Sequence, residues 1–208
     1  MNQRALHRLL ALTLLLIGTV LVLRALYIPA KGALAQVLLE RAFARAKPGE
    51  AAPKPWPWAD MVPIARLEIP RLDRAAIVLE GASGQAMAFG PGHMPNTPPV
   101  GAPGTAVIAA HRDTQFAFLG ALKPGDLIMV MTTEGQHLRF RVSESRIVPA
   151  DASGLDPADG GASGTRLALV TCYPFTGVLH SPLRYVVLAD QAPSINVELN
   201  RPAMERFP

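Results

Sequence analysis

The chain contains a single cysteine, Cys172, at the end of an apolar strand pattern. Residues 167–171 carry no charge and lead directly into it, and Pro174 then prevents the strand from continuing. A lone thiol cannot form an internal disulfide, so Cys172 is either a small hydrophobe of the core or a reactive group at its rim. A free thiol, with a pKa of about 8.5, is only slightly ionised at neutral pH, so a reactive one needs a cation nearby.

Two further residues at the ends of apolar runs offer such a thiol a proton-exchanging group and a cation. His111 closes the run 105–110, and Arg184 opens the run 184–188. An imidazole can exchange protons with a nucleophile or leaving group, and a guanidinium is always charged and donates several hydrogen bonds in one plane. Each residue alone is more often structural. The three types together, each at a strand end, favour nucleophilic catalysis with oxyanion stabilisation.

The residues around these three positions resemble the sortase family. The signature of that family is a strand ending Leu-x-Thr-Cys, here Leu169-Val170-Thr171-Cys172, with a histidine upstream and an arginine about a dozen residues downstream. The strings VIAAHRDTQF, LKPGD and SPLRYVV look like the sortases of Gram-negative bacteria, and the resemblance covers roughly residues 60–190. Ala168 departs from the pattern, because many sortases carry threonine there, and we expect it to affect packing only.

The resemblance implies a cysteine transpeptidase that uses no cofactor and no metal. Cys172 would attack a backbone carbonyl in a C-terminal sorting signal of the Leu-Pro-x-Thr-Gly kind. His111 would protonate the leaving amine, and Arg184 would stabilise the oxyanion or hold the peptide. The implied partners are a surface protein that carries the signal and an amine acceptor that resolves the thioester. Further residues are expected to contact the substrate: Leu169, Thr171, His93 and Asp113.

Some of these residues have alternative interpretations. Asp113 either orients the imidazole of His111 or caps a turn. A metal site would need other histidines to join His111 and Cys172, but no pair has zinc-like spacing and only one thiolate exists. Those other histidines are His93, His137 and His180.

Two other classes of function compete with the transpeptidase. A cysteine hydrolase without productive transfer would use the same thiol and imidazole. A membrane-anchored β-barrel that only binds a partner would leave Cys172 chemically ordinary. The Leu-x-Thr-Cys context favours the transpeptidase over both.

The charge distribution argues against a nucleic-acid-binding protein. The formal net charge is +4, but residues 1–47 hold seven Lys or Arg and one acidic residue, so the remainder of the chain is slightly acidic. A basic N-terminal segment favours an anionic membrane surface, and no nucleic-acid motif accompanies it.

The N-terminal segment predicts a membrane anchor. The apolar stretch 9–28 has the length of a transmembrane helix. Residues 1–8 precede it and form a short cytoplasmic N-terminus in the orientation that the family resemblance implies. A cleaved signal peptide is the alternative, because Ala-Leu-Ala at 33–35 is a small-x-small site. Positive charges flank the span on both sides and leave its orientation open. The resemblance implies a single-pass protein of the inner (cytoplasmic) membrane with its catalytic domain on the periplasmic, exported side.

Two connecting segments follow the span. Residues 29–47 place apolar side chains at helical spacing, which predicts an amphipathic helix that lies on the membrane, packs on the domain or merely continues the anchor as a stalk. The proline-rich stretch 48–61 predicts a stiff, extended linker. Its Trp56 and Trp58 sit either at the membrane interface or against the domain, and we favour the second position.

From residue 62 the chain consists of short apolar segments separated by Gly, Pro and Asp. This pattern, with no long helix, predicts an all-β domain over 62–190. We expect a closed antiparallel β-barrel of about eight strands with short helices, which is also the fold that the sortase resemblance implies. A helical turn near 83–89, a long loop over 90–104 and a loosely packed or disordered tail over 191–208 complete the interpretation. The predicted strands are 64–69, 75–79, 105–110, 126–132, 137–147, 166–171 and 184–188.

Overall fold

The structure is a computed structural model that describes residues 3–176 and 181–193. Side chains within the first helix are described except those of residues 5, 6, 8–11, 25, 26, 28–31 and 33. His180 and the greater part of the predicted tail, from residue 194 onward, lie outside the described residues.

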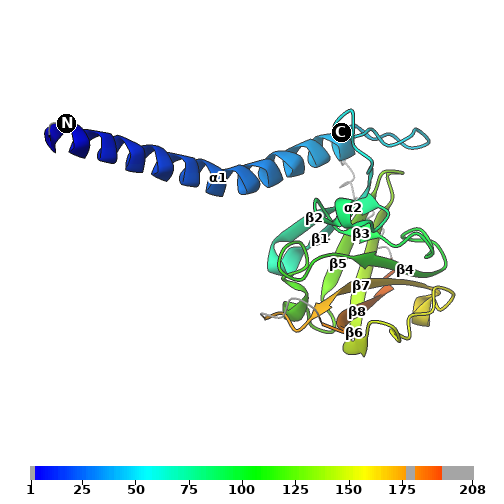
Figure 1. The fold of residues 1–208 in the computed structure, drawn as a ribbon. Helices are drawn as coiled ribbons and strands as arrows, with labels where there is room; N and C mark the ends of the chain where they lie inside the picture. Colours follow the sequence, from blue (N-terminus) through cyan, green and yellow to red (C-terminus); the bar gives the residue numbers. More distant parts are fainter. Residues whose placement is uncertain (1–2, 177–180, 194–208) are drawn as a thin grey trace, which may run out of the picture.

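Eight strands close into one barrel in the order β1-β2-β3-β4-β7-β8-β6-β5 (Figure 1). All seven predicted strands are confirmed, with ends that differ from the prediction by three residues at most. The eighth, β3, is a two-residue strand inside the stretch predicted as a loop, too short to leave a periodic pattern. The strands are β1 Pro63–Ile69, β2 Arg74–Glu80, β3 Gly92–His93, β4 Gly104–Ala109, β5 Leu127–Thr132, β6 His137–Pro149, β7 Thr165–Tyr173 and β8 Leu183–Gln191.

The prediction of an antiparallel barrel is wrong for two of the eight strand pairs. β2 pairs with β3 in parallel, and so does β4 with β7. Parallel neighbours need a long crossover instead of a tight hairpin. The crossover between β2 and β3 contains the short helix α2, Gly84–Met87, and the one between β4 and β7 contains β5 and β6. The Gly, Pro and Asp residues that separate the strands in the sequence do not reveal that the chain leaves β4 and returns beside it.

The short helices fill the connections between strands. Ser83 caps α2, because its side-chain oxygen accepts a hydrogen bond from the backbone N–H of Ala86. This confirms the predicted helical turn. Three short 3-10 helices complete the described connections: η1 Pro70–Leu72, η2 Leu119–Ala121 and η3 Gly161–Ser163.

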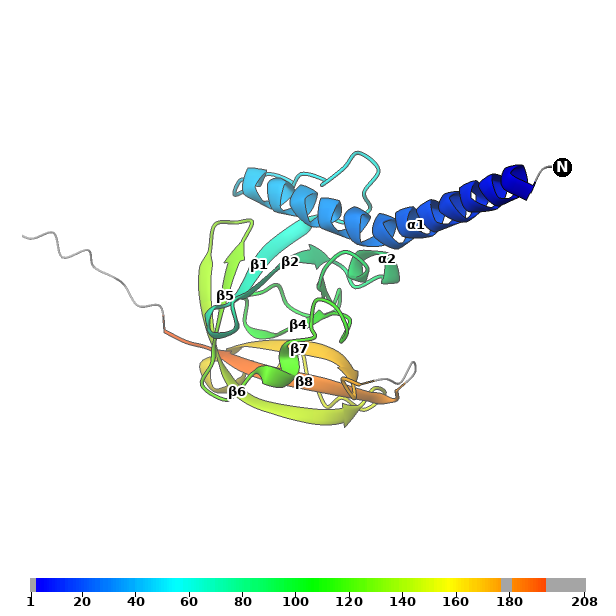
Figure 2. The ribbon, with the colours of Figure 1, turned by 90° about the vertical axis from the view of Figure 1, so that its left-hand side faces the viewer.

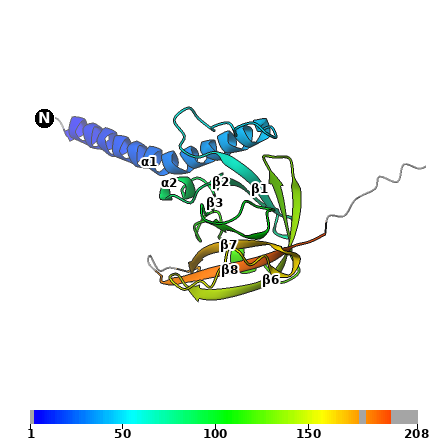
Figure 3. The same ribbon diagram turned by 90° about the vertical axis from the view of Figure 1, so that its right-hand side faces the viewer.

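One long helix, α1, runs from Gln3 to Arg45 and contains both the predicted anchor and the predicted amphipathic segment. Its C-terminal part lies across β1, β2 and α2 (Figures 2 and 3). Leu39 is completely buried there, and Glu40 accepts a hydrogen bond from Arg66 of β1 at 2.7 Å. The segment predicted to be amphipathic therefore packs on the domain, which is one of the three positions predicted for it. Within the described part of the chain, no helix combines the length and apolarity of a membrane span.

The linker folds back onto the same side of the barrel. The ring of Trp56 contacts that of Phe89 edge to face, with centroids 5.2 Å apart, and packs in the cluster that holds Leu39. This confirms the predicted position against the domain for Trp56. Trp58 remains 79% exposed, so the prediction does not hold for it.

Candidate active site

The structure places Cys172, His111 and Arg184 at the ends of three adjacent strands. Cys172 is the direct partner of Arg184 across β7 and β8. The parallel pairing of β4 with β7 ends at Ala109 and Val170, and the N–H of Ala110 still donates to the carbonyl of Val170 at 3.1 Å. Continuing this register by two residues places His111 opposite Cys172. We call these three residues the catalytic row.

Side-chain alternation sets the face on which the row lies. Leu169 belongs to the core inside the barrel, whereas Ala168 belongs to a separate cluster on the outer face of β7. Because alternate residues of a strand share a face, Cys172 lies on the outer face with Ala168. On the neighbouring strands, Val107 of β4 and Val186 of β8 belong to the same outer cluster. The same alternation puts His111, four residues after Val107, and Arg184, two residues before Val186, on the outer face. The three functional groups therefore face the same side of the sheet.

The row lies at the rim of the barrel. His111 is exposed, while Cys172 and Arg184 are half-buried. The Nη1 of Arg184 donates to the carbonyls of Ser181 and Leu183 at 2.9 and 3.0 Å, which ties its guanidinium to the turn that precedes β8. A thiol with partial access, an imidazole on one side and a guanidinium on the other can form, protonate and stabilise the species of an acyl transfer.

Thr171 and Leu169 do not line this outer face. Leu169 is completely buried in the barrel core. Thr171 is 2% exposed, and its hydroxyl donates to the carbonyl of Ala110 at 2.7 Å. The expectation that their side chains contact substrate is therefore corrected, because alternation turns both inward. The Thr171 bond instead joins β7 to the β4 segment one residue before Cys172 and His111.

Arg112 makes a second link between the same segments, which the sequence did not reveal. Its Nη1 donates to the carbonyl of Pro174 at 2.8 Å, across 62 positions of the chain. The bond fixes the residue after His111 to the turn that follows Cys172. The string His-Arg-Asp marks Arg112 in the sequence, but no local pattern indicates which distant carbonyl it reaches. Asp113 is exposed in this turn, and its two predicted roles stay predictions.

The loop between β6 and β7 covers the outer face beyond the row. Leu155 and Val148 pack on the outer-face cluster, in which Ala168 is fully buried, as expected for a position that affects packing. Farther along, Arg166 bonds Asp190 at 2.8 Å and Asp159 of the loop at 2.9 Å. The hydrogen bond to Asp190 raises the pKa of the Arg166 guanidinium. On the outer face, this loop contacts Arg146, the apolar cluster and Arg166.

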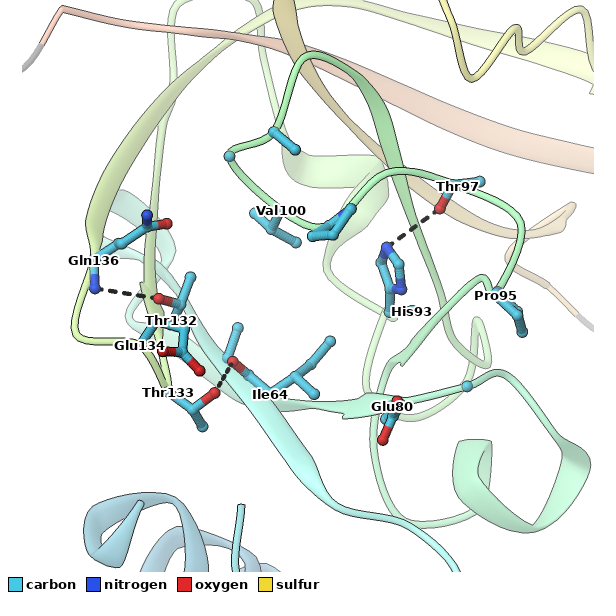
Figure 4. Close-up of a pocket in the computed structure, with 15 residues that line it drawn as sticks. Ile64, Glu80, His93, Pro95, Thr97, Val100, Thr132, Thr133, Glu134 and Gln136 are labelled. Atoms are coloured by element: carbon cyan, nitrogen blue, oxygen red, sulfur yellow. Dashed lines mark hydrogen bonds between the residues drawn. The ribbon is translucent and has the colours of Figure 1, made fainter. Parts of the chain in front are cut away.

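His93 lies in a separate pocket of about 890 Å³ (Figure 4). The pocket opens between the start of β1, the turn between β5 and β6, and the loop after β3, and no member of the catalytic row lines it. The Nε2 of His93 lies 2.8 Å from the carbonyl of Pro98 and 3.3 Å from the hydroxyl of Thr97. His93 therefore stabilises its own loop, apart from the row. We expect the chemistry at the row and not in this pocket, because acyl transfer needs the thiol.

No group of three or more His, Cys, Asp or Glu side chains that could hold a metal ion occurs among the described residues. The alternative metal site involving His180 falls outside those residues.

Comparisons with known proteins agree with the barrel fold. Residues 67–192 match the model of the sortase domain. The chain is 29% identical over 121 residues to Sortase D of Bacillus subtilis (strain 168), covering 58% of this chain and 60% of that relative.

Two solved structures are also similar. A Sortase D5 transpeptidase of Clostridium perfringens has a TM-score of 0.54 at 22% identity, over 64% of this chain and 80% of that one. A mutant of sortase E from Streptomyces avermitilis has a TM-score of 0.50 at 29% identity, over 63% of this chain and 88% of that one. Because the family model matches more than half of the sequence, the chain belongs to the sortase family.

Proposed function

We propose that this protein is a cysteine transpeptidase that cleaves a C-terminal sorting signal of the Leu-Pro-x-Thr-Gly kind and transfers the new carboxyl end to an amine. The observation that carries the proposal is the catalytic row, in which a half-buried thiol is paired across the strands with Arg184 and lies in register with His111. Membership of the sortase family supports the same reaction class.

The reaction follows from the order of groups in the row. The Cys172 thiolate attacks the carbonyl carbon of the scissile peptide bond, and the tetrahedral oxyanion accepts hydrogen bonds from Arg184. The C–N bond then breaks, and His111 gives its proton to the leaving amine. A thioester to Cys172 remains. An incoming amine attacks it, His111 takes the proton of that amine, and the thiolate leaves.

The surface beside the row suits an extended apolar peptide. Ala109 and Val170, one side-chain step from His111 and Cys172, are half-buried and uncovered enough to contact substrate. When an apolar peptide covers small aliphatic side chains, their removal from water lowers the free energy and favours binding. A Leu-Pro segment is therefore a suitable occupant of this surface.

Replacing the nucleophile tests the function. Cys172→Ala should abolish both cleavage of a Leu-Pro-x-Thr-Gly peptide and its transfer to an added amine, and mass spectrometry should no longer detect an acyl-enzyme. The thermal unfolding of the variant should match that of the unchanged protein, because the substitution is small and the site half-buried. A variant that still cleaves would exclude the thiol mechanism. Wild-type cleavage that yields only the hydrolysed peptide at high amine concentration would favour the hydrolase instead.

We propose further that the protein belongs to the Gram-negative sortase subgroup and is held in the inner membrane by residues 9–28, with the barrel in the periplasm. The apolar stretch of about twenty residues and the basic N-terminal segment in the sequence support the anchor. The sorting-signal protein would meet the enzyme at this membrane. Protease added to intact spheroplasts should remove the barrel, and full protection would contradict this orientation.

A further inference from the structure

A second arginine lies on the same outer face as the catalytic row. Arg146 of β6 is the cross-strand partner of Val186, and Val148, two residues later, is the partner of Arg184. Paired residues on antiparallel strands share a face, so Arg146 and Arg184 are diagonal neighbours on adjacent strands. Arg146 is therefore one side-chain step along the strands from the row.

The bonding of Arg146 is incomplete. Its Nη2 donates to the carbonyl of Gly154 at 3.3 Å, a long hydrogen bond. Its Nε is fully buried and has no hydrogen-bond partner within residues 3–176 and 181–193. Neither Arg146 nor Arg184 has a carboxylate within ion-pair distance among the described residues. Two half-buried positive charges beside the thiol are thus not bonded to a carboxylate in the part of the chain that the structure describes, and the nearest acidic residue along β6 is the exposed Glu144.

The surroundings make an uncompensated charge costly. Val186, Val148 and Leu155 belong to the apolar cluster of this face. A guanidinium next to apolar side chains loses hydration and interacts more strongly with any anion that approaches than it would in open solvent. The contrast is Arg166, farther along the same face, which is held by two carboxylates. No described carboxylate bonds Arg146 in the way that Asp159 and Asp190 bond Arg166.

We propose that Arg146 is an anion subsite that binds the side chain of an Asp or Glu in the sorting signal, close to the scissile bond. The inference rests on the proposed function, because the row defines where that bond lies. Because Nε is buried, the peptide carboxylate is bound through Nη1 and Nη2, with Nη2 exchanging its long bond to Gly154 for one to the peptide. Two parallel hydrogen bonds of this kind are ones that a neutral amide of the same size cannot match. The subsite therefore selects the charge of the peptide and not merely its shape.

The position of Arg146 limits where the acidic residue stands in the peptide. Cys172 and Arg146 are separated by two strand spacings of about 4.8 Å and one two-residue step of about 6.6 Å, which puts their Cα atoms about 12 Å apart. The long arginine side chain shortens that separation. Because an extended peptide advances about 3.3 Å per residue, the acidic residue lies within about three positions of the scissile bond. The variable position x of Leu-Pro-x-Thr-Gly satisfies this limit.

The test separates binding from turnover. The protein used is the detergent-solubilised full chain carrying Cys172→Ala. Fluorescence anisotropy measures its affinity for two labelled peptides, Leu-Pro-Glu-Thr-Gly and Leu-Pro-Gln-Thr-Gly. The Glu peptide should bind about tenfold or more tightly, as expected for charge-assisted hydrogen bonds. Adding Arg146→Gln should remove that preference while leaving the affinity for the Gln peptide within about twofold. Arg146→Lys should retain part of the preference, because it keeps the charge without the planar donors.

Arg141→Gln is the matched control, because Arg141 is an exposed arginine of the same strand whose side chain donates to the backbone carbonyl of Gly125. It should leave the preference unchanged. Equal affinities for the two peptides, or no measurable binding of the Glu peptide, would overturn the subsite. An Arg146→Gln variant that weakens both peptides equally would make Arg146 an anchor of the loop at Gly154. Peptides that bind with the predicted preference but are not cleaved by the protein with Cys172 intact would contradict the proposed function and leave the subsite standing.

Discussion

On the β1 side of the barrel, Arg66 lies between two carboxylates, those of Glu40 and Glu68, each at 2.7 Å. On the β8 side, Arg184 donates to the backbone carbonyls of Ser181 and Leu183. A guanidinium bonded to carboxylates has its charge neutralised locally and serves to join elements. One bonded to carbonyls keeps its full charge, because a carbonyl accepts a hydrogen bond without cancelling it. The difference separates the arginines that hold α1 on the barrel from those available to a substrate.

The largest effect in this comparison is expected from Arg184→Lys. Lysine keeps the positive charge but replaces a planar set of donors with one flexible ammonium group. If Arg184 donates to the developing oxyanion, turnover should fall on the order of 10²-fold or more, equivalent to about 2.7–4 kcal/mol. We predict this loss in kcat for peptide cleavage. The rate of thiol alkylation should change little, because it reports formation of the thiolate alone.

Arg66→Lys provides the control on the carboxylate-paired side. That substitution should leave peptide cleavage unchanged, because Arg66 lies on the far side of the barrel from the row. If Arg184→Lys keeps near-normal turnover, the oxyanion role is wrong and Arg184 acts only as a charge beside Cys172.

The sequence predicted the strands and the position of Cys172, His111 and Arg184 at strand ends, because both depend on local patterns. Apolar runs between Gly, Pro and Asp define strands, and Leu-x-Thr-Cys marks a strand end. The parallel pairing of β4 with β7 was not predicted, because register between distant strands leaves no trace in either strand alone. For the same reason the bonds of Thr171 to Ala110 and of Arg112 to Pro174 were found only in the structure.

The motif also misled the prediction of substrate contacts. Leu169 and Thr171 belong to the same signature as Cys172, which suggested a shared role. A strand alternates its faces, however, so Leu169 and Thr171 turn inward while Cys172 turns outward. A motif identifies the strand that carries a site, and only the pairing of that strand shows which of its residues the substrate can reach.

The β1 side of the barrel, where α1 packs, should control stability and not catalysis, which Leu39→Ala tests. Leu39 of α1 is completely buried among Met61, Ile77 and Leu79. Truncating a buried leucine to alanine leaves a cavity and should lower the free energy of unfolding by about 2–5 kcal/mol. Cleavage of a soluble peptide at a temperature where the variant is folded should not change. Denaturant unfolding followed by tryptophan fluorescence measures the first effect, since Trp56 packs in the same cluster.

Val37→Ala on the same helix is the matched control, because Val37 is 46% exposed and its truncation should cost less than about 0.5 kcal/mol. If Leu39→Ala were no more destabilising than Val37→Ala, α1 would not share in the cooperative unfolding of the barrel. If it reduced kcat as strongly as Arg184→Lys, the separation between the two sides would fail.

The smallest effect is expected from another paired arginine, Arg71. Its Nε and Nη2 each bond the carboxylate of Asp126 at 2.5 Å, and the N–H of Lys123 donates to the same carboxylate. The hydrogen bond from Arg71 holds the pKa of Asp126 below its ordinary value. Because the folded pKa is the lower one, the stabilisation is present above the pKa of the unfolded chain, about 3.9, and is lost as the pH falls through the folded value.

Asp126→Asn should therefore lower the stability to urea at pH 7, and the difference from the unchanged protein should shrink as the solution is acidified below about pH 3.9. The effect should be modest, because the side chain of Arg71 is 44% exposed and water screens the pair. Asp60→Asn, at an exposed linker position, controls for the loss of a carboxylate and should show no such dependence. A difference between Asp126→Asn and the unchanged protein that is the same in acid as at pH 7 would show that Asp126 stabilises the fold as a hydrogen-bond acceptor of either protonation state. In that case carboxylate pairing would not distinguish structural arginines such as Arg71 from Arg184 and Arg146.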